Sequence, residues 1–227
     1  MVANQYWHLD SMAVGSNPTA ATYLITKTPR RIRVGDGMSL QPIETSLKDF
    51  TPTKETVSLH GLGFIQMVLP CNQRLHVWHP DLPRRDCYEH SSIHNHRFSF
   101  VSRVIKGVQK NVRVDLELAR DGSHTIISHN GPRSDKGGRL SYPVAQCNVY
   151  ERECEVYGPG SEYEMPMHQY HHTPNSGIVV TLMRKLEESE IHANSVIRNG
   201  VEFHYAFDRF QLSQDRLLNY VMEALTA

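Results

Sequence analysis

From Thr56 onward, apolar residues come in short runs that are separated by glycine, proline and asparagine. Runs of this length, many of which alternate apolar with polar residues, are typical of half-buried strands. The pattern predicts an all-β sandwich or barrel, with strands over residues 63–69, 74–79, 97–105, 108–118, 124–128, 145–157, 162–167 and 178–184. Lys106-Gly107 and Asp121-Gly122 stand where tight hairpin turns are expected.

The two ends of the chain lack this pattern. Residues 1–55 are mixed in character and predict an irregular N-terminal arm that packs on the barrel, with a short helix over 43–50. After a barrel at 56–187, residues 188–227 are expected to form a hairpin around Asn199-Gly200 and an amphipathic helix over 213–225. Within the barrel, residues 130–139 contain no apolar anchor and predict a mobile loop.

Charge and cysteine content narrow the range of functions. Lysine plus arginine and aspartate plus glutamate number 24 each, so the chain lacks the net positive charge that favours nucleic acid or an anionic membrane. No apolar stretch reaches the length of a membrane span, and the first residues lack a signal-peptide pattern. The four cysteines form no CxxC pair and are expected to be reduced thiols. We therefore expect a cytoplasmic protein with no nucleic-acid or membrane partner.

The histidines gather in two segments of the predicted barrel. His94 and His96 lie two residues apart, so on a strand both side chains point from the same face. His168, His171 and His172 follow on a distant segment. Neutral imidazoles bind Zn, Fe, Ni and Cu, and three of them leave part of a coordination sphere open for water or substrate. The spacing therefore predicts an open metal site that includes His94 and His96.

The two histidine segments resemble the two sequence motifs of the cupin superfamily, which are small jelly-roll β-barrels. In the first motif, two histidines are followed by a glutamate and a glycine. Here His94 and His96 match, Gly107 keeps the register, and Phe100 stands in the place of the glutamate. The second motif is matched by four residues and departs at His168, where cupins have glycine; the matches are Gly160, Pro166, His171 and Asn175. The resemblance implies a cupin barrel over roughly residues 63–185.

The same resemblance implies a ligand set and a chemistry. The motif selects His94, His96 and His171 as metal ligands, although His172 is adjacent and stays open as the third ligand. Loss of the glutamate makes the site similar to that of thiol dioxygenases, in which three histidines hold Fe(II). Three histidines and a water also describe a hydrolytic zinc site. The resemblance favours Fe(II) and an oxygen-dependent reaction, with Zn, Mn and Ni as alternatives.

Three further residues near the motifs are candidates for catalysis. His168 is expected close to the metal, where it could be a fourth ligand, a general acid or base, or a plain turn residue. Tyr163 and Tyr170 could each place a phenol near the metal, as a tyrosine does in the thiol dioxygenases, or could simply pack in the core.

Three arginines are candidates for substrate binding. Arg113, on the polar face of the predicted strand over 108–118, is placed to pair with a carboxylate or phosphate through its planar fork. Arg97 and Arg103 have the outward parity of the His94 strand, which is more typical of solvated side chains. Phe98 and Phe100 have the same inward parity as His94 and His96, and they predict an apolar wall beside the metal.

Three functions are consistent with these residues. The first is an Fe(II) dioxygenase that acts on a small polar substrate, such as a thiol or a carboxylate. The second is a lyase, isomerase or hydrolase that uses Zn, Mn or Ni. The third is a cupin that binds a nucleotide or sugar phosphate without catalysis, because one fold hosts many activities. A homodimer is expected in each case, because cupins often pair through their sheet edges.

Overall fold

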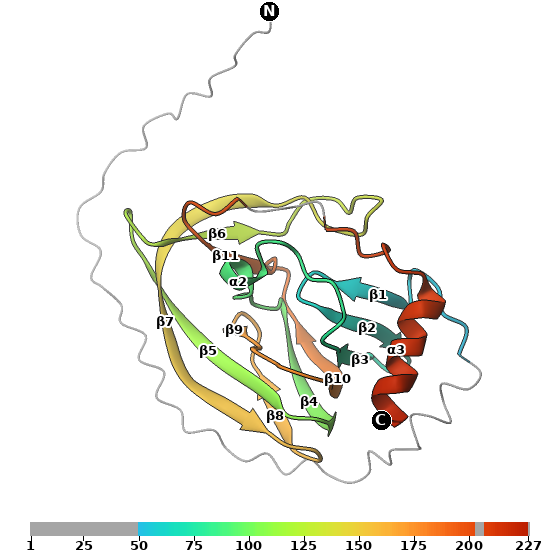
Figure 1. Cartoon of the computed structure of the whole chain (residues 1–227). Helices are drawn as coiled ribbons and strands as arrows, with labels where there is room; N and C mark the ends of the chain where they lie inside the picture. The colour runs from blue at the N-terminus through green and yellow to red at the C-terminus, as the bar shows by residue number, and fades with distance from the viewer. Residues whose placement is uncertain (1–49, 203–206, 227) are drawn as a thin grey trace, which may run out of the picture. The chain divides into compact units, whose positions relative to one another are not determined.

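Two antiparallel sheets make up the computed structural model, which describes residues 50–202 and 207–226 (Figure 1). One sheet has the strand order β1-β2-β3-β10-β4-β8, with bounds Val57–His60, Phe64–Leu69, Gln73–Trp78, Val179–Glu188, Phe98–Lys106 and Glu162–Met165. The other has the order β11-β6-β7-β5-β9, with bounds Asn194–Arg198, His124–Ser128, Tyr142–Tyr157, Gln109–Leu118 and Tyr170–His172. Two helices accompany the sheets, α2 at Tyr88–Ser91 and α3 at Gln214–Thr226.

This architecture confirms the predicted fold class. Every predicted strand has its counterpart within a few residues, and the predicted C-terminal helix is α3. Lys106-Gly107 makes the turn from β4 to β5, where Gly107 has a φ of 74° and a Cβ would meet the Ile178 carbonyl at 2.2 Å. Sequence reasoning missed β1, β9 and α2, which are too short for a periodic pattern to develop.

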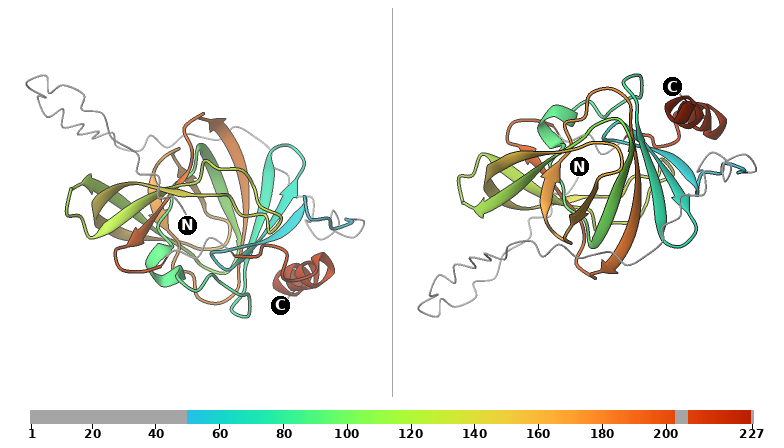
Figure 2. Two further views of the ribbon diagram at one scale, coloured as in Figure 1. Left: turned by 90° about the horizontal axis from the view of Figure 1, so that it is seen from above. Right: turned by 90° about the horizontal axis from the view of Figure 1, so that it is seen from below.

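In β1–β3, the six-stranded sheet carries its apolar face outward, on the side of α3. Its fully buried aliphatic side chains share one parity; they include Val57, Leu59, Ile65, Met67, Leu75 and Val77. Helix α3 lies against β1 and β10 and buries Leu217 and Val221 (Figures 1 and 2). The opposite face of β1–β3 presents polar and aromatic side chains toward the interior, among them His60, Gln66, Arg74 and His76.

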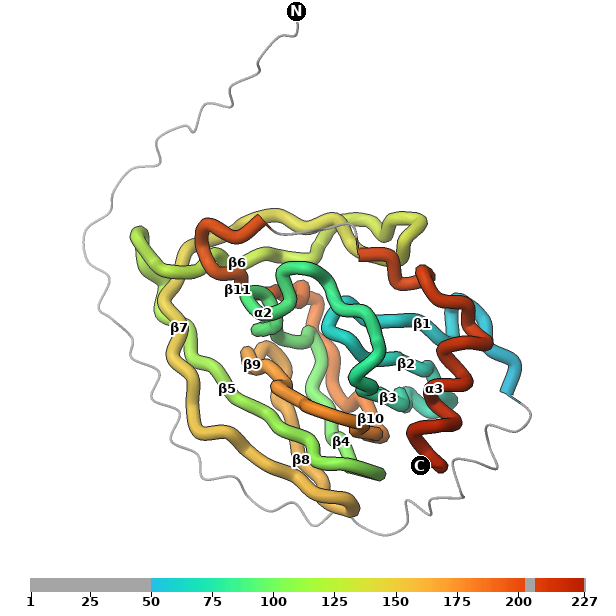
Figure 3. Tube along the Cα trace, in the orientation of Figure 1, coloured from blue at the N-terminus to red at the C-terminus, as the bar shows by residue number. Residues whose placement is uncertain are grey.

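The five-stranded sheet curls until a short segment joins its two edges. His94 makes isolated antiparallel bridges both to His171 of β9 and to Ser195 of β11. His94 and His171 exchange two backbone hydrogen bonds of 3.0 and 2.9 Å, and the Asn95 amide donates to the Asn194 carbonyl at 2.9 Å. Figure 3 shows β9 and β11 approaching each other near α2. The segment that carries the first two histidines is therefore fixed from both sides.

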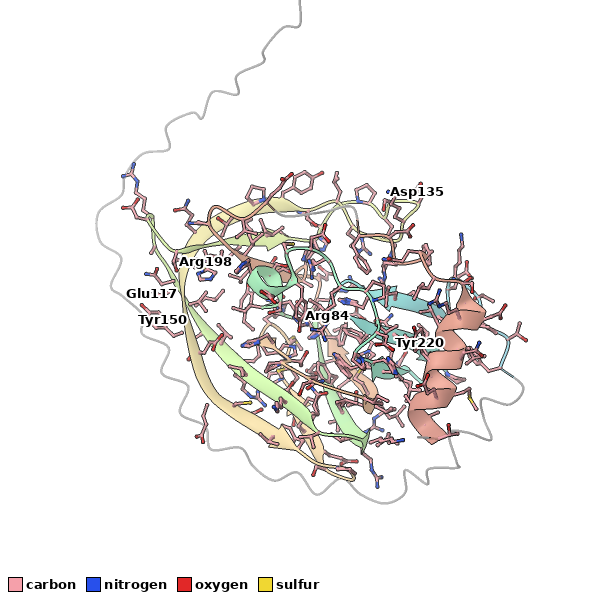
Figure 4. The ribbon with its side chains drawn as sticks, in the orientation of Figure 1. Arg84, Glu117, Asp135, Tyr150, Arg198 and Tyr220 are labelled. Atoms are coloured by element: carbon pink, nitrogen blue, oxygen red, sulfur yellow. The ribbon has the colours of Figure 1, made fainter. Side chains whose placement is uncertain are left out.

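Residues 130–139, predicted to be a mobile loop, belong to a hydrogen-bonded hairpin. Arg133 and Arg139 are bridge partners, and the Gly131 and Leu140 amides donate to the Leu140 and Pro132 carbonyls at 3.0 Å each. Asp135 marks the tip of this hairpin (Figure 4). The Arg209 amide donates to the Lys136 carbonyl at 3.0 Å, and the Phe210 ring lies close to Gly137, so contacts with residues 209 and 210 hold the hairpin.

Several predictions fall on residues that the structure does not describe. The arm at 1–55 and the helix at 43–50 lie mostly outside the described residues. The predicted 195–203 hairpin has its first strand in β11, which pairs with β6, and Asn199-Gly200 forms a turn, but its end at Phe203 lies outside the described range. The domain boundaries at 55/56 and 187/188 stay a prediction. Among the described helices, neither is long and apolar enough to cross a membrane.

Candidate metal centre and its cavity

Three histidines meet where the His94 segment joins the two sheet edges. The ligand atoms of His94, His96 and His171 all lie within 4.8 Å of one another, and this is the one such group of histidine, cysteine or carboxylate side chains among the described residues. The Nε2 atoms of His96 and His171 are 3.1 Å apart. His94 and His96 lie outside regular strands, since β4 begins only at Phe98. They nevertheless point to the same side, with ring centroids 4.9 Å apart.

The surroundings keep these imidazoles neutral and ready to accept a cation. Burial lowers the pKa of His94 to about 4, and burial together with the neighbouring histidines lowers the pKa of His96 and of His171 well below the usual value. The Nδ1–H of His94 donates to the Ser92 carbonyl at 2.8 Å, which leaves Nε2 as the free lone pair. The Nδ1 atom of His171 is buried without a partner among the described residues, so packing and its backbone bonds hold this ring.

The donor set fits a divalent metal ion. Metal–nitrogen bonds of about 2.0–2.1 Å place neighbouring ligands roughly 3 Å apart, close to the spacing of the His96 and His171 Nε2 atoms. No carboxylate belongs to the group. Instead, the rings of Phe98 and Phe100 each lie 5.2 Å from the His96 ring, and both are buried. The predicted apolar wall is therefore present, with Phe100 in the position where the cupin motif has a glutamate.

The two adjacent histidines of β9 point to opposite sides, as strand geometry requires. His171 belongs to the histidine group, whereas Nε2 of His172 lies 3.0 Å from Oε1 of Glu151. The geometry therefore selects His171 over His172 as the third candidate ligand.

The candidate catalytic residues are dispersed. His168 lies outside the three-histidine group; its backbone amide donates to the His96 carbonyl at 2.8 Å, and its φ of 62° explains why the motif has glycine here. Tyr163 is buried among Phe100, Met165 and Tyr157, with a ring distance of 4.8 Å to Tyr157.

Tyr170 packs away from the three-histidine group. It neighbours His171 on β9, so it points to the other face, where it contacts the apolar cluster around Ile126 and Val196. Its hydroxyl accepts a hydrogen bond from Nδ2 of Asn194 at 3.1 Å. Packing is therefore the role that its contacts indicate.

A cavity of about 370 Å³ opens beside the histidine group and is lined by His94 and His96. Of the three arginines proposed as substrate ligands, only Arg97 lines it. Arg113 lies opposite His171 in the β5–β9 ladder, but its Nε is engaged with Oε1 of Glu155 at 2.8 Å and its Nη2 with the Glu164 carbonyl at 2.9 Å. Arg103 does not reach the cavity.

Most of the cavity's cationic side chains were missed from the sequence. Besides Arg97, the lining contains Arg74, Arg85, Arg133, Arg139, Lys185 and Arg209. Phe98 connects them to the histidines, because its ring lies beside His96 and under two cations, with the Arg74 guanidinium at 5.3 Å and the Lys185 ammonium at 4.6 Å. These residues come from separate strands and loops, so no local motif signals them.

His129 is a further cavity residue that sequence reasoning did not identify. The Ser141 hydroxyl donates to the Arg139 carbonyl at 3.0 Å, so it accepts from Nδ1 of His129 at 2.6 Å. Nε2 of His129 then accepts from the Ser195 hydroxyl at 2.7 Å. Burial lowers the pKa of His129 to about 4. All three side chains line the cavity, where they form an ordered chain of proton donors and acceptors.

Comparison with known proteins gives remote structural neighbours. No protein-family model and no curated protein sequence matches the chain. Hydroquinone 1,2-dioxygenase from Sphingomonas sp. TTNP3, solved with 4-hydroxybenzoate bound, is 12% identical over 53% of this chain and 67% of that chain, with a TM-score of 0.26. Hydroquinone 1,2-dioxygenase PnpCD, in complex with Cd2+ and 4-hydroxybenzonitrile, is 14% identical over 71% and 82%, with a TM-score of 0.27. At this level of similarity, function has to be argued from the chain's own residues.

Proposed function

We propose that this chain is a metal-dependent enzyme of the cupin type, which binds Fe(II) through His94, His96 and His171. The observation that carries the proposal is the meeting of three neutral imidazoles, within 4.8 Å of one another, at the wall of a cavity. Oxygen-dependent turnover of a small anionic molecule is the reaction that we infer. A ferrous ion held by three histidines would supply a Lewis acid and a redox-active centre for the reaction with oxygen.

The chain's own residues perform the remaining tasks. The cavity's arginines would attract an anionic substrate and orient it toward the histidines. Phe98, which lines the cavity, and Phe100, which is buried, shield the His96 ring from water. The Ser195–His129–Ser141 chain could carry a proton to or from the bound molecule, because each of its links is within hydrogen-bond distance.

Reconstitution under anaerobic conditions tests the proposal. Metal-free protein is dialysed against Fe(II), Zn(II) or Mn(II), and bound metal is measured by elemental mass spectrometry. Oxygen uptake is then followed with L-cysteine, 3-mercaptopropionate and oxaloacetate as probe acids. We expect near-stoichiometric Fe(II), and oxygen uptake above that of a His171→Ala variant. Uptake of Zn(II) but not Fe(II) would contradict the oxygen-dependent reaction, and no metal uptake would contradict the metal site.

A second candidate function is binding of an anionic ligand without catalysis. The observation that favours it is the cationic lining of the cavity, which is complete without a metal ion. In that case metal-free and metal-loaded protein would bind the same anion with equal affinity.

A further inference from the structure

The cavity beside the histidines contains far more positive than negative charge. Seven arginine and lysine side chains line it, against the single carboxylate of Glu188. Across the whole sequence the two signs balance, at 24 each. The excess is therefore a local arrangement and not a consequence of a basic protein.

Glu188 neutralises only part of this charge. Its Oε1 lies 2.7 Å from Nη2 of Arg97, and its Oε2 lies 2.7 Å from Nζ of Lys185. Arg133 and Arg139 each donate to a backbone carbonyl, of Gly137 at 2.9 Å and of Gly131 at 3.1 Å. Neither arginine has a carboxylate partner among the described residues. A guanidinium has five N–H donors, so most of theirs remain available.

Two deeper arginines also donate their hydrogen bonds to neutral acceptors. Arg209 is half-buried and donates from Nε to the Leu59 carbonyl at 3.1 Å and from Nη2 to Oγ of Ser58 at 3.0 Å. Arg74, also half-buried, donates from Nη1 to Oε1 of Gln66 at 3.4 Å. Each is oriented by neutral acceptors. Neither forms an ion pair with a carboxylate among the described residues, although the charge of Glu188 also acts on Arg74.

The backbone forces these like charges together. Arg133 and Arg139 are directly opposite each other in an antiparallel bridge, a position where like charges are destabilising. The hydrogen bond from the Arg209 amide to the Lys136 carbonyl brings Arg209 to the same hairpin. Burial and the neighbouring guanidiniums of Arg133 and Arg74 lower the pKa of Arg209 to about 10. Repulsion of this kind is relieved when an anion binds between the charges.

We propose that the cavity binds a small polyanion, one that carries at least two negative charges on phosphate or carboxylate groups and is held by Arg74, Arg133, Arg139 and Arg209. This proposal rests on the proposed function in one respect, since it identifies the class of molecule that reaches His94 and His96. The exposed arginines of the hairpin would attract the polyanion, and the half-buried Arg74 and Arg209 would hold it. The planar fork of arginine suits both kinds of oxyanion.

Calorimetric titration of the full-length, metal-free protein tests the proposal with three probes: inorganic pyrophosphate, citrate and acetate. We expect pyrophosphate or citrate to bind at least about 10-fold more tightly than acetate, with an affinity that falls as salt is added. Tighter binding of pyrophosphate would assign a phosphate-bearing substrate, and tighter binding of citrate a polycarboxylate. Equal, weak binding of all three probes would overturn the proposal.

A double variant, Arg133→Gln with Arg139→Gln, locates the site. Because both side chains are exposed, the variant should remain folded, and its circular dichroism checks this. We expect the affinity for the better probe to fall more than about 10-fold. Arg120→Gln is the matched control, since Arg120 is exposed and does not line the cavity. Equal loss in the control and in the double variant would indicate non-specific charge attraction and would overturn the proposal.

The same variants separate this proposal from the proposed function. Metal content is measured on the double variant, whose histidine group is unaltered. Near-stoichiometric metal with lost polyanion binding supports both proposals. Polyanion binding by a protein that takes up no metal supports the polyanion site and contradicts the metal site. Metal uptake without polyanion binding in the wild-type protein contradicts the polyanion site alone.

Discussion

The histidine group and the arginines of the same cavity each bring titratable side chains close together, but the histidines are neutral and the arginines are charged. Burial keeps His94, His96 and His171 neutral, so their nitrogens can approach one another without repulsion. The arginines stay charged, and their backbone positions force them to repel one another. Neutral lone pairs at short range suit a cation, whereas fixed positive charges suit an anion.

This difference would let one cavity bind two ligands of opposite charge. Phe98 lies between the two regions, beside His96 and under Arg74 and Lys185. Its ring therefore contacts both an imidazole and two of the cations. Each region can therefore be changed by mutation while the other is left in place.

The largest effect should come from placing a charge among the neutral histidines. Phe100→Glu puts a carboxylate at the cupin glutamate position, 5.2 Å by ring distance from His96. Without metal, the buried carboxylate and the lost ring should cost about 3 kcal/mol of unfolding free energy. With metal, the carboxylate can become a ligand and recover most of that loss. Chemical denaturation with and without Mn(II) or Fe(II) measures both values.

Val104→Glu is the matched control for this variant. Val104 is fully buried on the same face of β4 but lies farther along the strand from His96. Its replacement should destabilise the protein to a similar extent, with no recovery on adding metal. If both variants respond to metal alike, Phe100 does not stand beside the metal site.

The second-largest effect is expected in the pH dependence of stability, because buried histidines are neutral in the folded protein. His129 has a pKa lowered to about 4 from an ordinary 6.5, so between these values the unfolded chain binds a proton that the folded protein does not. Stability should therefore be constant above pH 6.5 and should fall as the pH drops from 6.5 toward 4. One such group contributes up to about 3 kcal/mol over that range.

Urea denaturation of metal-free protein at several pH values measures this slope. In His129→Gln the slope should be shallower, although the stability at neutral pH also falls because two hydrogen bonds are lost. A slope equal to that of the wild type would mean that His129 titrates alike in the folded and unfolded states.

The smallest effect should come from the arginine region, through its one acidic partner. Glu188→Gln frees Arg97 and Lys185 and adds to the positive charge of the cavity. The pair is exposed, so stability should change by less than about 1 kcal/mol. Pyrophosphate affinity, measured by calorimetry at low salt, should rise a few-fold. Weaker binding would show that Glu188 orients the anion-binding side chains instead of opposing the anion.

The same two regions differ in how far sequence predicts them. The histidine pair and His171 lie in two short motifs, so both the fold class and the meeting of these residues could be predicted, although His94 and His96 lie just before β4 and not on a strand. Arg74, Arg133, Arg139 and Arg209 come from a strand, a hairpin and a loop that meet only after the chain has folded. Arg113 was predicted as a substrate ligand from its strand face, but Glu155, across the β5–β7 ladder, engages it. The alternation of side chains along a strand predicts which face of the sheet a residue occupies, but it does not predict which partner the residue contacts there.

The measurement that tests the central claim most directly is the metal content of three proteins purified without a chelating tag. These are the wild type, His171→Ala and His172→Ala, each dialysed against the same Fe(II) concentration. We predict near-stoichiometric metal in the wild type and in His172→Ala, because His172 faces Glu151 on the other side of β9. His171→Ala should bind more than about 100-fold more weakly, since outer-shell partners alone are worth about 10- to 100-fold. Equal metal content in all three proteins would contradict the assignment of the histidine group.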